Sequence, residues 1–268
     1  MKLAAMEALY DGGTAQGLKI IEGIEVPYAL SFMATNDFQG YVPGINDILN
    51  GYTHADGTQE PPADEKIARG KQAIAALAAY RKAKAEGADE ETINAQLSIL
   101  NANMQYFGYG YIKDKSEVVP YIPVNFWAFR IMVGLGCVFI LYFIVLLLMV
   151  YDVPFLSIFT RRLLATIGLL PETAADAKGI TGLPDWHYWA AILLVPLAYI
   201  ASECGWLVAE FGRQPWTIQD MLPTWASVSD LNASSVALTF FLFLALFSTM
   251  LAVEINILLK QIKKGPEK

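Results

Sequence analysis

Four charged side chains in this sequence lie within long apolar segments, where a charge is costly and needs a physical reason. Arg130 lies near the start of one segment, Glu203 and Glu210 lie in a second, and Glu254 lies near the end of a third. A charge at the centre of a bilayer costs on the order of 2.5–3.5 kcal/mol on insertion scales, and such residues commonly act as proton relays, metal ligands or ion-pair partners. These four positions are therefore the first candidates for chemistry.

Each of these charges also has a structural interpretation, and the sequence leaves the alternatives open. Arg130 could extend to water at the membrane surface, or it could neutralise a buried anion such as a haem propionate or a quinone headgroup. Glu203 lies too deep to reach water easily, so it is a proton relay, a metal ligand or a protonated, hydrogen-bonded carboxyl. Glu210, two helical turns further on, shares its face and could face water or pair with Arg213. Glu254 precedes a run of lysines and is expected at the interface.

The other ligand-type side chains exclude several kinds of site. Two histidines, His54 and His187, cannot form an all-histidine metal site within this chain, and we expect the first to be exposed and the second to be interfacial. The two cysteines, Cys137 and Cys204, both lie in apolar runs, which excludes a disulfide scaffold and a cysteine-rich metal site. On composition alone, Met132 is an ordinary core methionine.

The three apolar segments are each long enough to span a bilayer, which takes about 20 mostly apolar residues. They cover residues 126–151, 187–211 and 236–259, in a chain of 268 residues that is 55% apolar and 17% charged. A helix is the one open structure that satisfies its own backbone in lipid. We therefore predict an all-α membrane protein whose three transmembrane helices lie in a domain of residues 121–268.

Residues 1–120 form a separate acidic domain before the helices. They carry 10 of the 19 Lys and Arg residues and 16 of the 26 Asp and Glu residues. Turn-forming residues over 8–60 indicate irregular structure, and the composition predicts helices over 62–87 and 89–105. Tyr106, Tyr109, Tyr111 and Tyr121 could form an interfacial aromatic belt or belong to the core of this domain. An acidic chain without a basic cluster outside its last ten residues is a poor binder of nucleic acid.

The distribution of basic residues predicts the orientation in the membrane. The connection between the first two helices and the C-terminal tail are both basic, whereas the connection over 212–232 has Arg213 alone. The positive-inside rule then places the first connection and the C-terminus in the cytoplasm and residues 1–120 outside it. The basic residues used are Arg161, Arg162, Lys178, Lys260, Lys263, Lys264 and Lys268.

A set of motifs resembles a known family. The segments 2–8 (KLAAMEA), 129–132 (FRIM), 203–206 (ECGW), 212–216 (GRQPW) and 222–224 (LPT) occur in this order. Together they resemble the C-terminal half of subunit I of the cytochrome bd-type quinol oxidases, in the class with a long quinol-binding loop. The resemblance extends from residue 2 into the third apolar segment.

The resemblance implies roles for residues near the quinol site. Lys2 and Glu7 match the start of the quinol-binding loop, where a carboxylate can accept a quinol proton and a lysine can stabilise the developing oxyanion. Met132 matches the methionine that ligates the low-spin haem b, for which a neutral thioether raises the haem potential. Arg130 matches an adjacent arginine that would interact with this haem or with the quinol.

The resemblance also implies a second cofactor site. Glu203 matches the glutamate at the high-spin pair of haem b and haem d, where it would ligate iron or donate a proton during oxygen reduction. Trp206 and Arg213 are expected to pack against these haems or at the interface. Tyr199 departs from the family, which carries a tryptophan at that position.

Further implications concern residues and partners outside this chain. In the family, helices that precede Lys2 supply the histidine ligands of the haems, and neither His54 nor His187 matches them. The chain is therefore expected to be inactive alone, and to need the missing N-terminal half, subunit II, quinol, oxygen and membrane lipid in the bacterial inner membrane. The alternative functions are a non-catalytic assembly or interaction module that retains this scaffold, and a small transporter that uses Glu203 as a proton carrier.

Overall fold

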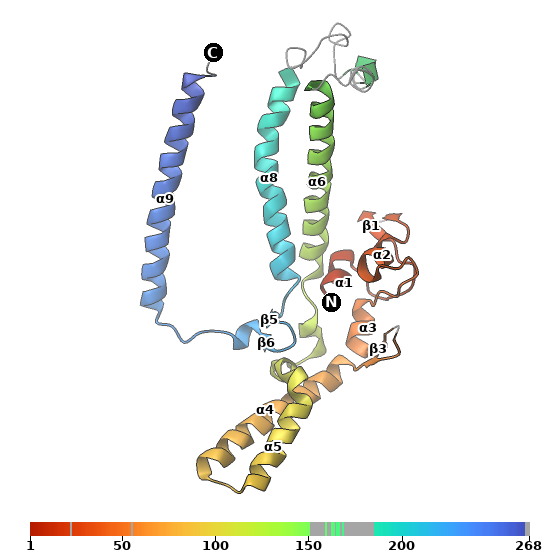
Figure 1. Ribbon diagram of the computed structural model, residues 1–268, viewed down its shortest axis with the longest axis vertical. Coiled ribbons are helices and arrows are strands. Elements are labelled where there is room, and N and C mark those ends of the chain that lie inside the picture. The colour runs from red at the N-terminus through yellow and green to blue at the C-terminus, as the bar shows by residue number, and fades with distance from the viewer. Residues whose placement is uncertain are drawn as a thin grey trace. The chain divides into compact units, whose positions relative to one another are not determined.

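The computed structural model describes residues 1–21, 23–54, 56–150 and 185–265, together with 159, 162, 163, 165, 166 and 168 (Figure 1). Within these residues it is largely helical, with three helices long and apolar enough to cross a membrane. They are α6 (Ile122–Val150), α8 (Asp185–Phe211) and α9 (Ala233–Lys264). The predicted all-α class and its three spanning helices are confirmed.

Each spanning helix begins earlier than its apolar run. Pro123 lies in the first turn of α6, where a missing N–H removes no helical hydrogen bond. Because α6 begins at Ile122, Arg130 lies two turns into the helix. Asn232 caps α9, because its Oδ1 accepts a hydrogen bond from the Ser234 N–H at 3.0 Å. The predicted end of the first segment, Tyr151, lies outside the described residues.

Helices α6 and α8 pack against each other in antiparallel directions (Figure 1). Near the start of α6, Ala128 contacts the buried Cys204 and Val208 near the end of α8. Further along α6, the Tyr142 hydroxyl donates a hydrogen bond at 3.2 Å to the carbonyl of His187, which lies in the first turn of α8. Helix α9 belongs to a second compact unit, residues 227–268.

The segment predicted to be irregular, residues 8–60, contains short regular elements. After α1 (Lys2–Glu7) come an antiparallel hairpin of β1 (Leu18–Ile21) and β2 (Ile24–Val26), then α2 (Ala29–Thr35) and α3 (Ile45–Asn50), and a second hairpin of β3 (Tyr52–Thr53) and β4 (Gln59–Glu60). The buried side chains that hold the first of these elements together are Ala4, Leu9, Leu30, Val42 and Ile45.

The predicted helical hairpin is confirmed in α4 (Ala63–Glu86) and α5 (Glu90–Asn103). Gly87 ends α4 in the left-handed conformation, with φ of 69°, which glycine adopts without a steric penalty. The Asp89 carboxylate then caps α5 by accepting hydrogen bonds from the Thr92 backbone N–H and hydroxyl. Between the two helices lie Ala73, Ala76 and Leu100.

A tyrosine-rich segment connects the N-terminal region to the loop after α8. This segment, η1 (Met104–Tyr111), precedes η2 (Lys115–Val118), and the loop contains β5 (Trp216–Ile218), β6 (Leu222–Pro223) and η5 (Thr224–Ala226). The buried Tyr109 donates a hydrogen bond to Asp220 at 2.8 Å, and its ring centroid is 4.9 Å from that of Trp216. Tyr109 is therefore a core residue, whereas Tyr121 is exposed.

Candidate functional site

The Glu7 carboxylate, at the end of α1, is the centre of a buried polar cluster. The residue is only 1% exposed. Its Oε2 accepts a hydrogen bond from the Lys19 backbone N–H at 3.0 Å and lies 3.2 Å from Arg130 Nη2. Its Oε1 is also buried, and it has no hydrogen-bond partner among the described residues. One oxygen is thus fixed in place, and the other is enclosed without a hydrogen-bond partner among the described residues.

The Arg130 guanidinium connects α6 to α1 and β1 instead of extending to water. Its Nη1 donates hydrogen bonds to the carbonyls of Met6 at 2.8 Å and Phe126 at 3.1 Å, and its Nη2 donates to the Lys19 carbonyl at 2.8 Å. The guanidinium carbon also lies 3.5 Å from the centroid of the Phe126 ring. Five charge-assisted or cation–π contacts to Glu7 and its neighbours therefore hold this side chain.

Burial and charge act in opposite directions on Glu7. Desolvation raises the pKa of the Glu7 carboxyl, while the Lys19 N–H, the Arg130 guanidinium and the Lys19 ammonium lower it. The net effect is a pKa above the ordinary value for glutamate. A carboxyl whose pKa is raised in this way is a better proton acceptor than an exposed one when it is ionised.

A groove of about 720 Å³ lies next to this cluster. Its lining includes Lys19 from β1 and the aromatic side chains of Phe126 and Trp127 from the first turns of α6. Phe126 connects the two features, because it lines the groove and also contacts the Arg130 guanidinium. The lining residues are Ala8, Tyr10, Lys19, Ile21, Gly23, Ile24, Glu25, Ile122, Pro123, Phe126 and Trp127.

Lys2 and Glu7 lie on the same short helix but have different neighbours. Lys2 is exposed, and its aliphatic stem lies against Gly212, since a Cβ added there would be 2.8 Å from Lys2 Cγ. The same added atom would be 3.0 Å from Oδ1 of the fully buried Asn125. That oxygen has no hydrogen-bond partner among the described residues, whereas Asn125 Nδ2 donates to the Tyr121 carbonyl at 2.9 Å. The structure thus brings Lys2 to the first residue of the GRQPW motif rather than to Glu7.

Met132 points to α8. A Cβ added to Gly205 would lie 3.1 Å from Met132 Sδ, so the absence of a side chain at Gly205 leaves space for the thioether. Met132 is half-buried beside Ala128 and Cys204. A neutral thioether is a donor type that can ligate haem iron, and here its sulfur packs against Gly205.

Glu203 and Trp206 lie on the exposed side of α8, together with Tyr199. These residues are spaced by four and three positions, which places them on one helical face. The face has no partner among the described residues. Within the described residues, no three His, Cys, Asp or Glu side chains converge as a metal site.

Arg213 is exposed, and the described residues show no ion pair between it and Glu210. Its backbone instead orders the turn, since its N–H donates to the Glu210 carbonyl at 3.3 Å and its carbonyl accepts from the Trp216 N–H at 2.9 Å. The predicted interfacial His187 is buried and stacks on Tyr142, with ring centroids 4.9 Å apart.

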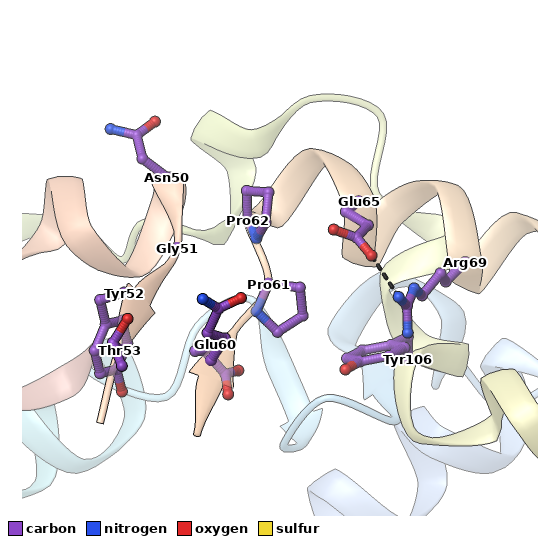
Figure 2. Close-up of a pocket in the computed structure, with 11 residues that line it drawn as sticks. Asn50, Gly51, Tyr52, Thr53, Glu60, Pro61, Pro62, Glu65, Arg69 and Tyr106 are labelled. Carbon is purple, nitrogen blue, oxygen red and sulfur yellow. Dashed lines mark hydrogen bonds and ion pairs between the residues drawn. The ribbon is translucent and has the colours of Figure 1, made fainter. Parts of the chain in front are cut away.

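A second cavity, of about 470 Å³, lies where β3 and β4 meet α4 and η1. Figure 2 shows Glu65 and Arg69 of α4 joined by an ion pair, with the guanidinium beside the ring of Tyr106. None of the residues that we expected to be functional lines this cavity. Its charged groups are already paired at the surface, so we assign it no role.

Sequence reasoning missed Asn125 and the contribution of Lys19. Asn125 is a buried polar residue inside an apolar helix, and its residue type alone could have identified it as a candidate. The contacts of Lys19 with Glu7 and Arg130 come from its backbone N–H and carbonyl. Backbone groups occur at every position, so no sequence signal indicates them.

Comparison with known proteins gives consistent matches. Residues 1–266 match the family model described as cytochrome bd terminal oxidase subunit I. The chain is 25% identical over 248 residues to cytochrome bd-II ubiquinol oxidase subunit 1 of Escherichia coli (strain K12), which covers 91% of the chain. It is also 25% identical over 280 residues to cytochrome bd ubiquinol oxidase subunit 1 of Bacillus subtilis (strain 168), covering all of it. In both cases the match spans 42% of the relative's length.

Proposed function

Because this chain belongs to the cytochrome bd terminal oxidase subunit I family, we propose that it supplies the quinol-oxidising region and part of the haem-binding region of a quinol:oxygen oxidoreductase. The observation that carries this proposal is the buried Glu7 carboxylate. One of its oxygens is held by Arg130 and the Lys19 N–H, and the other has no partner among the described residues. A groove lined by aromatic side chains lies beside it.

The proposed reaction at this site is the oxidation of a quinol. A quinol becomes a quinone when it loses two electrons and two protons, and a proton must leave the hydroxyl before or with an electron. Glu7 Oε1 would accept that proton, and the Arg130 guanidinium would stabilise the carboxylate that receives it. Lys2, which matches the lysine that the family uses, would stabilise the developing oxyanion from the exposed side of α1 next to Gly212, and not from a position beside Glu7.

Met132 would hold the low-spin haem b from one side. Its sulfur is neutral, which suits a ligand that favours the reduced iron, and in the structure it packs against Gly205. When bound, this haem would supply one-electron transfer. Arg130, two residues before Met132, is engaged with Glu7, Met6 and Lys19 in the structure, which favours a role at the quinol site over a role as a free counter-charge.

Glu203, Trp206 and Arg213 would serve the high-spin pair of haem b and haem d. The exposed face of α8 that carries Glu203 and Trp206 would be covered by residues outside this chain, which also supply the histidine ligands. In the complete oxidase, four electrons from two quinols and four protons reduce one oxygen molecule to two waters. We expect subunit II as a partner, residues 1–120 outside the bacterial inner membrane and the C-terminus in the cytoplasm.

The test is a Glu7→Gln substitution in the complete oxidase, with Glu65→Gln as a matched control, because Glu65 is exposed. Glutamine keeps the size of the side chain but cannot accept the proton. We expect quinol oxidation to fall by about 10²-fold or more, the contribution typical of a positioned acid–base group, while the haem absorbance spectrum is kept. Activity equal to that of Glu65→Gln would contradict the proposal and favour a non-catalytic module.

A further inference from the structure

The hairpin of β1 and β2 exposes a set of large apolar side chains, which we call the apolar hairpin. Ile20 is 51% exposed, Ile21 47%, Ile24 54% and Val26 43%. The strand pairing shifts register between Lys19 and Ile21, so Ile20 is an extra residue without a cross-strand partner. The described residues thus leave these four side chains largely uncovered, whereas Leu18 of the same hairpin packs against the core. A contiguous apolar patch on a protein surface usually marks contact with a partner or a membrane.

The position of the apolar hairpin is fixed relative to a membrane-spanning helix. Ile21 and Ile24 line the same groove as Pro123, Phe126 and Trp127 from the first turns of α6, so the hairpin lies beside the start of a helix that is long and apolar enough to cross a membrane. Trp127 is 58% exposed, and tryptophan is enriched where a helix crosses from headgroups to acyl chains. The apolar surface of α6 therefore continues across the groove onto the hairpin.

The charges of the hairpin indicate how deep it lies. Lys19 and Glu25 are directly opposite each other across the strands. The Glu25 carboxyl folds back over Gly17, since a Cβ added there would be 2.8 Å from Glu25 Cδ. Glu22 follows Ile21 in the sequence, and its structure is outside the described residues. A segment with these three charges and four large apolar side chains suits the headgroup region and not the acyl core.

We propose that the apolar hairpin is a membrane-contact surface, which rests in the lipid headgroup region beside the first turns of α6 and forms one wall of a groove open to the bilayer. A lipid-soluble molecule could then enter the groove sideways from the membrane. The identification of this molecule as a quinol rests on the function proposed above. For the contact with lipid, it rests on the exposure and position of the hairpin alone.

The experiment places a fluorescent probe on the hairpin of the complete oxidase. The native cysteines are replaced, Ile24→Cys is labelled with the environment-sensitive dye NBD, and the oxidase is reconstituted into phosphatidylcholine and phosphatidylglycerol vesicles. Ala85→Cys, an exposed position near the turn between α4 and α5, is the matched control. Because Ile24→Cys could disturb the hairpin pairing with Ile21, Ile20→Cys is labelled as a second variant.

We expect lipids with a nitroxide near the headgroup to remove most of the NBD emission at positions 24 and 20 and little at position 85, where aqueous iodide quenches instead. Quenching at 24 and 20 by iodide alone would place the hairpin in water and overturn the proposal. Protection from both quenchers would mean that protein covers the hairpin, and would also overturn it. Neither result depends on quinol oxidation, so failure here is distinct from failure of the proposed function.

Discussion

Replacing Arg130 tests the reasoning about the buried cluster most directly. Arg130 Nη2 lies 3.2 Å from Glu7 Oε2, which corresponds to an attraction of about 5 kcal/mol at an effective dielectric constant of about 20. Removing one partner of a buried pair typically costs about 3–5 kcal/mol, because the other charge is left uncompensated. In Arg130→Gln, the Glu7 carboxylate would keep the Lys19 N–H and lose its principal counter-charge.

The sign of the effect on activity follows from the proposed role of Glu7 as proton acceptor. Burial raises the pKa of Glu7 and Arg130 lowers it, so Arg130→Gln raises it further. The ionised form that accepts the proton then appears only at higher pH. We expect the pH of half-maximal quinol oxidation to increase. We also expect the rate at neutral pH to fall about tenfold for every 1.4 kcal/mol of transition-state stabilisation that is lost with the Arg130 guanidinium.

The assay is the quinol oxidation rate of the complete oxidase as a function of pH, with the absorbance of the low-spin haem recorded on the same samples. Arg69→Gln is the matched control, because Arg69 forms an exposed pair with Glu65 that contributes only about 0–1 kcal/mol. Arg130→Lys keeps the charge without the forked geometry, and we expect it to be intermediate. An unchanged pH profile together with loss of the low-spin haem would refute the assignment of Arg130 to Glu7.

Three further predictions follow from the same contacts. Met132→Leu nearly conserves the side-chain volume and should cost less than about 1.5 kcal/mol of stability, yet it should abolish the absorbance band of the low-spin haem. A normal band would contradict the ligand role of Met132 and would be consistent with the transporter alternative. Tyr109→Phe removes the hydrogen bond to Asp220 and should lower the free energy of unfolding by about 0.5–1.5 kcal/mol, measured by thermal melting, and no change would mean that the bond contributes nothing. Burial raises the folded-state pKa of Glu7, so the contribution of Glu7 to stability is greatest below the ordinary carboxyl pKa and is lost as pH rises through the folded-state pKa. Melting temperatures measured across this pH range should decline in the native protein and change less in Glu7→Gln. Equal slopes in the two proteins would contradict this prediction.

The spanning helices could be predicted from the sequence because their signal is compositional. Long apolar runs identify α6, α8 and α9 without knowledge of any contact. Their starts were misplaced by a few residues, because helices extend past the apolar run where a cap such as Asn232 or a first-turn proline such as Pro123 permits. The short strands of the first 60 residues were missed, since two to four residues carry too little periodicity to detect.

The candidate site was predicted only in part. Its residues could be selected, since a charge in an apolar segment is costly and motifs resemble a known family. The pairing of Arg130 with Glu7 could not be predicted, because the two residues are 123 positions apart in the sequence. The energetic cost of a charge in an apolar segment indicates that a partner is needed, but it does not identify the partner. The same limit applies to Met132 and Gly205, whose contact depends on how α6 and α8 pack.

Arg130 and Met132 project from different sides of α6 at nearly the same height along the helix. Two residues along a helix turn it by about 200° and advance it by about 3 Å, so the side chains diverge. Arg130 reaches Glu7 and β1, whereas Met132 meets Gly205 of α8. A single helix would then separate the place where a proton leaves from the place where an electron departs. The thickness of one helix, about 10 Å, would then lie between the proposed proton acceptor and the proposed haem ligand.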